Sequence, residues 1–140
     1  MEVPSVSSDE GSSRMEEETQ KLLYIQTNGV EAPERSATPF YLAASAAAMD
    51  IEVGIYFTVN GPTLLVRGVA EELIPKKDGK GAPLRRFIDQ AAELGVKFYV
   101  CQPSLDLSNL SYEDLIDGVE MIGGAAFNDM ALEADAVISF

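Results

Sequence analysis

The interpretation of this chain depends on one stretch of nine residues, Val96-Lys97-Phe98-Tyr99-Val100-Cys101-Gln102-Pro103-Ser104. Its first half is rich in β-branched and aromatic residues, a composition typical of a β-strand. Pro103 has no N–H to donate to a sheet, so we expect the strand to stop near Cys101. The only cysteine of the chain is therefore predicted at the carboxyl end of a strand, where open α/β sheets bind their ligands. The alternative is a small buried core residue, the usual state of a lone cysteine on an apolar strand.

Outward from this stretch, short apolar segments alternate with segments of helical periodicity. Gly95 ends an amphipathic segment that Pro83 begins, so a helix should lead directly into the cysteine strand. The segment 63–74 is ambiguous, and we favour a broken helix there. Ser111 to Asp114 resembles a capping box with Asp in place of Glu. The expected strands are 21–26, 51–57, 96–100, 119–122 and 136–140, and the expected helices are 38–49, 83–94, 111–117 and 126–134.

This alternation predicts an α/β fold of three layers, flavodoxin-like or Rossmann-like, with a mainly parallel five-stranded sheet. A chain of 140 residues has room for one such domain. We expect it over residues 21–140. The preceding residues 1–20 carry six acidic side chains against one arginine and little apolar surface. That composition indicates a disordered acidic N-terminal tail.

The charge of the chain argues against two classes of partner. With 23 acidic and 10 basic residues, the formal net charge is −13. A protein this acidic has no overall positive field with which to bind nucleic acid or an anionic membrane surface. The sequence also shows no signal peptide and no apolar run long enough to cross a membrane. With one cysteine there is no internal disulfide, so we expect a cytoplasmic protein.

The residues available for chemistry are few. The chain has no histidine, which excludes a Ser-His-Asp triad and an imidazole metal site, and we expect neither metal nor cofactor. No Gly-x-Gly-x-x-Gly or P-loop motif is present. Cys101 is then the one side chain able to act as a nucleophile or to accept sulfur, provided that its thiolate is stabilised. Asn28-Gly29 and Gly123-Gly124 follow predicted strands and are weak candidates for anion contacts, although each is typical of an ordinary turn.

Five of the ten basic residues cluster just before the cysteine strand. In so acidic a chain this cluster could attract an anionic substrate or an acidic partner. A solvated loop and first helical turn would have the same composition. The five residues are Lys76, Lys77, Lys80, Arg85 and Arg86.

The order of these pieces resembles the DsrE/DsrF-like family of small sulfurtransferases, which includes the TusD-type relay subunits. The resemblance covers about 21–140. It depends most on Gly95-Val96-Lys97-Phe98-Tyr99-Val100-Cys101 and on the downstream Leu115-Ile116-Asp117-Gly118-Val119. The resemblance places the family's functional cysteine on Cys101. It implies sulfur held there as a persulfide or thiosulfonate, exchange with a small TusA-like carrier protein or a low-molecular-weight donor, and a homo-oligomer, either trimer or hexamer.

Two hypotheses follow. The first is a cytoplasmic sulfurtransferase or sulfur carrier that holds sulfane sulfur on Cys101 and passes it to a partner thiol, because no second cysteine exists for an internal transfer. The second is a non-catalytic oligomeric assembly or small-ligand-binding subunit with Cys101 buried and inert. A flavin- or nucleotide-binding flavodoxin-like protein is disfavoured because a phosphate-binding loop is missing.

Overall fold

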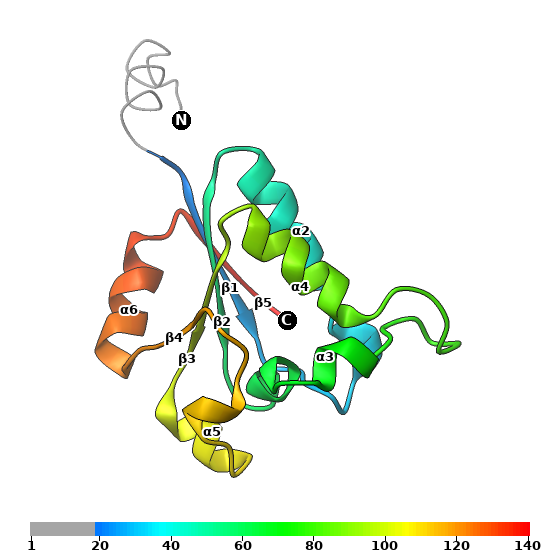
Figure 1. Cartoon of the computed structure of the whole chain (residues 1–140). Coiled ribbons are helices and arrows are strands. Elements are labelled where there is room, and N and C mark those ends of the chain that lie inside the picture. The colour runs from blue at the N-terminus through cyan, green and yellow to red at the C-terminus, as the bar shows by residue number, and fades with distance from the viewer. Residues whose placement is uncertain (1–18) are drawn as a thin grey trace.

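A computed structural model describes residues 19–140, which form a three-layer α/β domain around one five-stranded sheet (Figure 1). The strand order is β4-β3-β2-β1-β5, and every neighbouring pair is parallel. The fold class expected from the sequence is confirmed. The expected tail at 1–20 lies almost wholly outside the described residues.

The elements follow one another along the chain as the sequence suggests. The strands are β1 (Lys21–Gln26), β2 (Glu52–Phe57), β3 (Lys97–Val100), β4 (Val119–Met121) and β5 (Ala136–Ser139). The α-helices are α2 (Thr38–Ala48), α3 (Val69–Glu72), α4 (Leu84–Glu93), α5 (Gln102–Leu107) and α6 (Gly124–Glu133). Three short 3₁₀ turns complete the described part: η1 (Pro33–Arg35), η2 (Gly61–Leu65) and η3 (Tyr112–Asp114).

Most of the core lies between the sheet and helices α2 and α4, which cover one of its faces. Because side chains alternate along a strand, Ile55 and Phe57 of β2 point to this face, as Phe98 of β3 does. Phe40 of α2 packs between them, with its ring centroid 5.6 Å from both Phe57 and Phe98. The alanines of α2 allow this close approach, since Ala43 is fully buried. This face holds the larger of the two core clusters.

The opposite face is covered by α6 alone (Figure 1). Strands β1 to β4 are laid down in one direction across the sheet, and β5 then returns to the far side of β1. A right-handed crossover in the reverse direction carries its helix to the other face, which explains the solitary position of α6. A smaller cluster forms beneath it, in which Leu23, Tyr56 and Cys101 are the buried members. The thiol therefore faces the lightly covered side of the sheet.

Two local predictions are confirmed, the capping box at Ser111 and the broken helix over 63–74, and two are wrong. Ser111 and Asp114 form the expected reciprocal capping box, although it opens a single turn and not a helix to 117, which is the first error. The segment 63–74 is helical and broken, as favoured. The second error concerns the residues after Cys101, where α5 begins at once although no helix was expected before Ser111. Pro103 ends the strand, but it does so within the first turn of a helix, where its missing N–H costs nothing.

None of the helices among the described residues combines the length and the apolar character that crossing a membrane requires.

Candidate functional site

The thiol of Cys101 lies at the junction of β3 and α5, at the carboxyl edge of the sheet. Backbone hydrogen bonding of the strand ends at Val100, and Cys101 is the residue before the first turn of α5. Only 9% of Cys101 is exposed. A pocket of about 420 Å³ nevertheless opens beside it. Burial therefore limits access to the thiol without sealing it from solvent.

The pocket beside Cys101 carries no charged side chain. Its walls come from the end of β2, the start of α5 and the turn between β4 and α6. The lining residues are Tyr56, Cys101, Gln102, Pro103, Met121, Ile122, Gly123 and Gly124. The predicted pair Gly123-Gly124 thus lies at the site. A Cβ atom built on either glycine would meet nothing within 4 Å, so both border open space.

A hydrogen-bond network surrounds the sulfur. Cys101 Sγ lies 3.2 Å from Ser104 Oγ, which in turn lies 2.9 Å from Thr58 Oγ1. The Val59 N–H donates to the same Ser104 oxygen at 3.2 Å. On the other side, the ring of Tyr56 packs against Phe127 of α6 with centroids 4.4 Å apart. Cys101 therefore contacts the Ser104 hydroxyl directly, and the Thr58 hydroxyl is linked to the sulfur only through Ser104.

These groups shift the thiol toward its reactive form. Burial by itself raises the pKa of Cys101, because the thiolate is the charged form. Hydrogen bonds from the Ser104 hydroxyl, from Tyr56 and from backbone amides outweigh the burial, so the pKa lies below its ordinary value. The pKa of Tyr56 is raised, first by burial and then by its hydrogen bond to the sulfur and the charge of the thiolate. Tyr56 thus remains a neutral donor.

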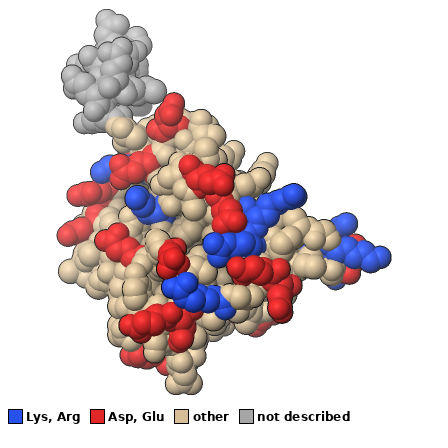
Figure 2. Space-filling view, in the orientation of Figure 1, with Lys and Arg blue, Asp and Glu red and all other residues tan. Residues whose placement is uncertain are grey.

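The other predicted site residues lie elsewhere. The basic cluster is on α4 and on the loop before it, which projects at the right of Figure 1, and none of its side chains lines the pocket. Lys76 pairs with Asp78 at 3.4 Å, and Arg85 pairs with Asp89 at 2.9 Å. Figure 2 shows basic and acidic side chains intermixed over this part of the surface. The structure therefore does not bring the cluster to Cys101.

Asn28-Gly29 is also separate from the thiol pocket. The Gly29 N–H already donates to both carboxylate oxygens of Glu31, at 3.0 Å each. A Cβ atom on Gly29 would lie 2.0 Å from the Asn60 carbonyl oxygen, so the glycine is required by close packing. The amide is occupied by a carboxylate of the chain itself, and the turn has a clear structural role.

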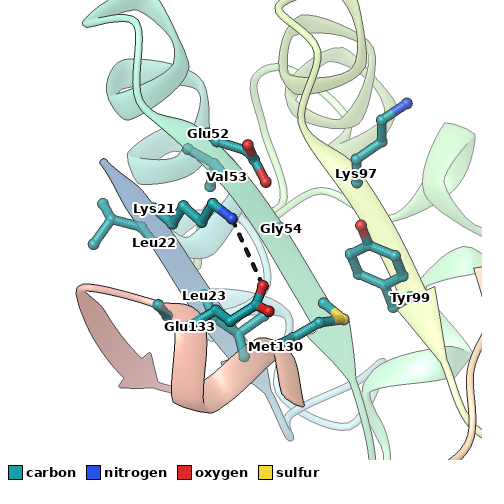
Figure 3. Close-up of a pocket in the computed structure, with 11 residues that line it drawn as sticks. Lys21, Leu22, Leu23, Glu52, Val53, Gly54, Lys97, Tyr99, Met130 and Glu133 are labelled. Atoms are coloured by element: carbon teal, nitrogen blue, oxygen red, sulfur yellow. Dashed lines mark ion pairs between the residues drawn. The ribbon is translucent and has the colours of Figure 1, made fainter. Parts of the chain in front are cut away.

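A second, smaller pocket of about 90 Å³ lies toward the amino ends of the strands, on the α6 side (Figure 3). Tyr99 packs so closely on Gly54 that a Cβ there would lie 2.8 Å from the ring. The ammonium of Lys21 pairs with Glu133 at 3.7 Å across the pocket. Glu52 and Lys97 add one charge of each sign. The charges balance, and the pocket does not contain the thiol.

The sequence analysis missed the partners of the sulfur. Ser104 and Thr58 are 46 residues apart, and only the pairing of β2 with β3 brings them together. The one local signal was Pro103, which is typical of a first helical turn, and a helix that starts after Cys101 turns Ser104 back toward the thiol.

Among the residues described, no group of three or more Cys, Asp or Glu side chains is placed to hold a metal ion.

Fold and site together define a small parallel α/β protein with one hydrogen-bonded thiol at the carboxyl edge of its sheet. The chain belongs to the DsrE/DsrF-like family, whose model matches residues 20–140.

Three known proteins illustrate the relationship. The chain is 29% identical over 155 aligned positions to the sulfur carrier protein DsrE2 of Allochromatium vinosum, covering 84% of this chain and 96% of that protein. The crystal structure of the ychN protein of E. coli superposes with a TM-score of 0.64 at 22% identity, over 87% of this chain and all of that one. The protein MTH1491 of Methanobacterium thermoautotrophicum gives 0.57 at 14% identity, over 88% of this chain and all of that one. The two structures support the fold.

Proposed function

We propose that this chain is a sulfur carrier or sulfurtransferase that holds sulfane sulfur on Cys101. The observation that carries the proposal is the thiol itself: it is the only one in the chain, it opens to a pocket, and its pKa is lowered by hydrogen bonds. Membership of the DsrE/DsrF-like family and similarity to a protein named as a sulfur carrier support the same chemistry.

The reaction requires no redox cofactor. The Cys101 thiolate attacks the sulfane sulfur of a donor such as thiosulfate or a polysulfide, and a new S–S bond forms on Sγ. The donor's own bond to that sulfur breaks, and its electron pair leaves with sulfite or with the shortened polysulfide. With tetrathionate the same attack leaves a bound thiosulfonate and releases thiosulfate. An acceptor thiolate then attacks the outer sulfur of the persulfide, and the electron pair returns to Cys101.

The acceptor must be another molecule, because no second cysteine exists in the chain. A small TusA-like carrier protein or a low-molecular-weight thiol would serve. The uncharged pocket favours contact through shape and apolar surface at the site itself. We place this exchange in the cytoplasm.

The test is intact-mass spectrometry of the native protein after incubation with thiosulfate, tetrathionate or polysulfide. We expect an adduct of one sulfur atom or one thiosulfonate that a reductant removes. Protein unfolded in urea serves as the matched control, because it exposes the thiol without the pocket. Uptake by unfolded protein alone would show that Cys101 is an inert core residue and would favour the assembly hypothesis.

We also propose a homo-oligomer, a trimer or a hexamer, formed through the outer edge of β5. Strands of parallel sheets are usually covered on both faces, yet every residue of β5 is exposed. Val137 and Ile138 are 44% and 41% exposed, and α6, which leads into β5, adds Leu132 at 84%. An uncovered apolar edge of this kind suits a second copy of the same chain.

Light scattering of the purified protein should therefore give a mass well above the 15.1 kDa of one chain. The Ile138→Lys variant is expected to shift the mass toward that of the monomer, because an ammonium would have to be buried in the interface. Leu94→Lys, at a similarly exposed position just after α4, is the control and should keep the native mass. A monomeric native protein would contradict this assignment, as would an Ile138→Lys variant of unchanged mass.

A further inference from the structure

The hydroxyl of Ser104 has three hydrogen-bond partners but only one proton to donate. Its oxygen contacts Cys101 Sγ at 3.2 Å, Thr58 Oγ1 at 2.9 Å and the Val59 nitrogen at 3.2 Å. A hydroxyl offers one proton and two acceptor positions. The backbone N–H of Val59 can only donate, so it fills one acceptor position. The remaining acceptor position and the single proton are shared between Thr58 and Cys101.

When Cys101 is a thiolate, only one arrangement of the Ser104 hydrogen bonds is possible. The sulfur of a thiolate can only accept, so the Ser104 proton must point at Sγ. Thr58 must then donate to Ser104, and both acceptor positions are filled. The chain of donors runs from Thr58 through Ser104 to the sulfur. Ser104 is 3% exposed, so water has little access to replace any of these bonds.

The backbone at Val59 supports the same arrangement. Its φ is +57°, in the left-handed region that a β-branched residue rarely adopts. Val59 is 45% exposed, so its own burial does not compensate for the strain. In this conformation the Val59 N–H points at Ser104 Oγ and donates to it. Strained backbone of this kind tends to occur at functional sites.

None of the side chains that line the pocket beside Cys101 is charged. The pocket wall offers Tyr56 from β2, Gln102 and Pro103 from α5, and Met121 to Gly124 from β4 and the turn that follows it. Tyr56 is the only titratable side chain among them besides Cys101, and α6 contributes the apolar Phe127 behind it. Stabilisation of the thiolate therefore depends on neutral donors.

We propose that Ser104 is a positioning residue whose hydroxyl proton is held on Cys101 Sγ by two donors behind it, the Thr58 hydroxyl and the Val59 N–H. The proposal rests on the proposed function in one respect, that the thiolate is the reacting species. Thr58 acts through Ser104 and does not touch the sulfur in this network.

The test is the pH dependence of alkylation of the native protein by iodoacetamide, which reports the pKa of the thiol. Ser104→Ala should raise that pKa by about one pH unit, and the alkylation rate should fall about tenfold at a pH below both values. Thr58→Val, of the same shape, should raise the pKa by roughly half as much, because Ser104 keeps its proton but loses a donor. Ser108→Ala, at the end of α5, is the control and should leave the profile unchanged.

An unchanged profile in Ser104→Ala would overturn the proposal, and so would an unchanged or lowered pKa in Thr58→Val. Each variant is first checked for a native circular dichroism spectrum. Thr58→Val keeps the proposal testable if Ser104→Ala does not fold. Because iodoacetamide transfers no sulfur, the profile stands apart from the carrier function. A protein that takes up no sulfur but shows the Ser104 effect would contradict the proposed function and leave this inference intact.

Discussion

Replacement of Cys101 by alanine is expected to abolish sulfur uptake completely. Cys101 is the only thiol of the chain, and no other side chain can form a persulfide or thiosulfonate. The fold should survive. Point substitutions typically cost about 1 kcal/mol, and the position already borders a pocket. Ser104 would still have its hydrogen bonds with Thr58 and Val59, and the Tyr56 hydroxyl, which loses the sulfur as a partner, borders the pocket.

The matched control is Cys101→Ser, which keeps the size of the side chain and its hydrogen-bonding capacity. Both variants should show a native circular dichroism spectrum and neither should gain mass with thiosulfate, tetrathionate or polysulfide. A sulfur adduct on the folded Cys101→Ala protein would contradict the assignment of Cys101 as the carrier residue.

Gly61→Ala is expected to be strongly destabilising, although it adds a single methyl group. A Cβ atom there would lie 2.3 Å from the Gln26 carbonyl oxygen and 3.3 Å from Phe57 Cβ. Both neighbours are buried strand residues, so neither can shift without disturbing the packing around it. We expect a loss of about 3 kcal/mol or more, a large part of the roughly 5–15 kcal/mol that stabilises a domain.

Urea unfolding followed by circular dichroism measures this loss. Gly123→Ala is the control: its Cβ would meet nothing within 4 Å, and its free energy of unfolding should change by less than about 1 kcal/mol. Equal stability of Gly61→Ala and the native protein would show that the turn after β2 is not packed as described. The turn matters for function because it supplies Thr58 and Val59 to the network around the thiol.

The sequence was sufficient to predict the fold because each strand is short and apolar and is followed by a recognisable break. Gly95 and Pro83 mark the ends of α4, and the Ser111–Asp114 box forms as expected. The helix that was not expected, α5, has six residues, too few for helical periodicity to show. The only sequence signal for α5 was Pro103, and a proline is equally compatible with the end of a strand and with the first turn of a helix.

The site was less predictable than the fold. The placement of Cys101 at the carboxyl edge of the sheet followed from local pattern alone. Its hydroxyl partners did not, because Thr58 and Ser104 meet only through the pairing of β2 with β3. Charge clustering in the sequence was a poor guide to position. Arg85 satisfies its charge with Asp89 on the same helix, on the face of the sheet away from the thiol.

The most direct test of the account is whether sulfur placed on Cys101 can leave it. Protein loaded with polysulfide and freed of excess donor is mixed with a purified small carrier protein that has one reactive cysteine, and the masses of both are followed. We predict that this chain loses one sulfur atom while the acceptor gains one, and that Cys101→Ala transfers none. Loaded protein that keeps its sulfur in the presence of every acceptor thiol tried, small or protein-borne, would contradict a carrier function.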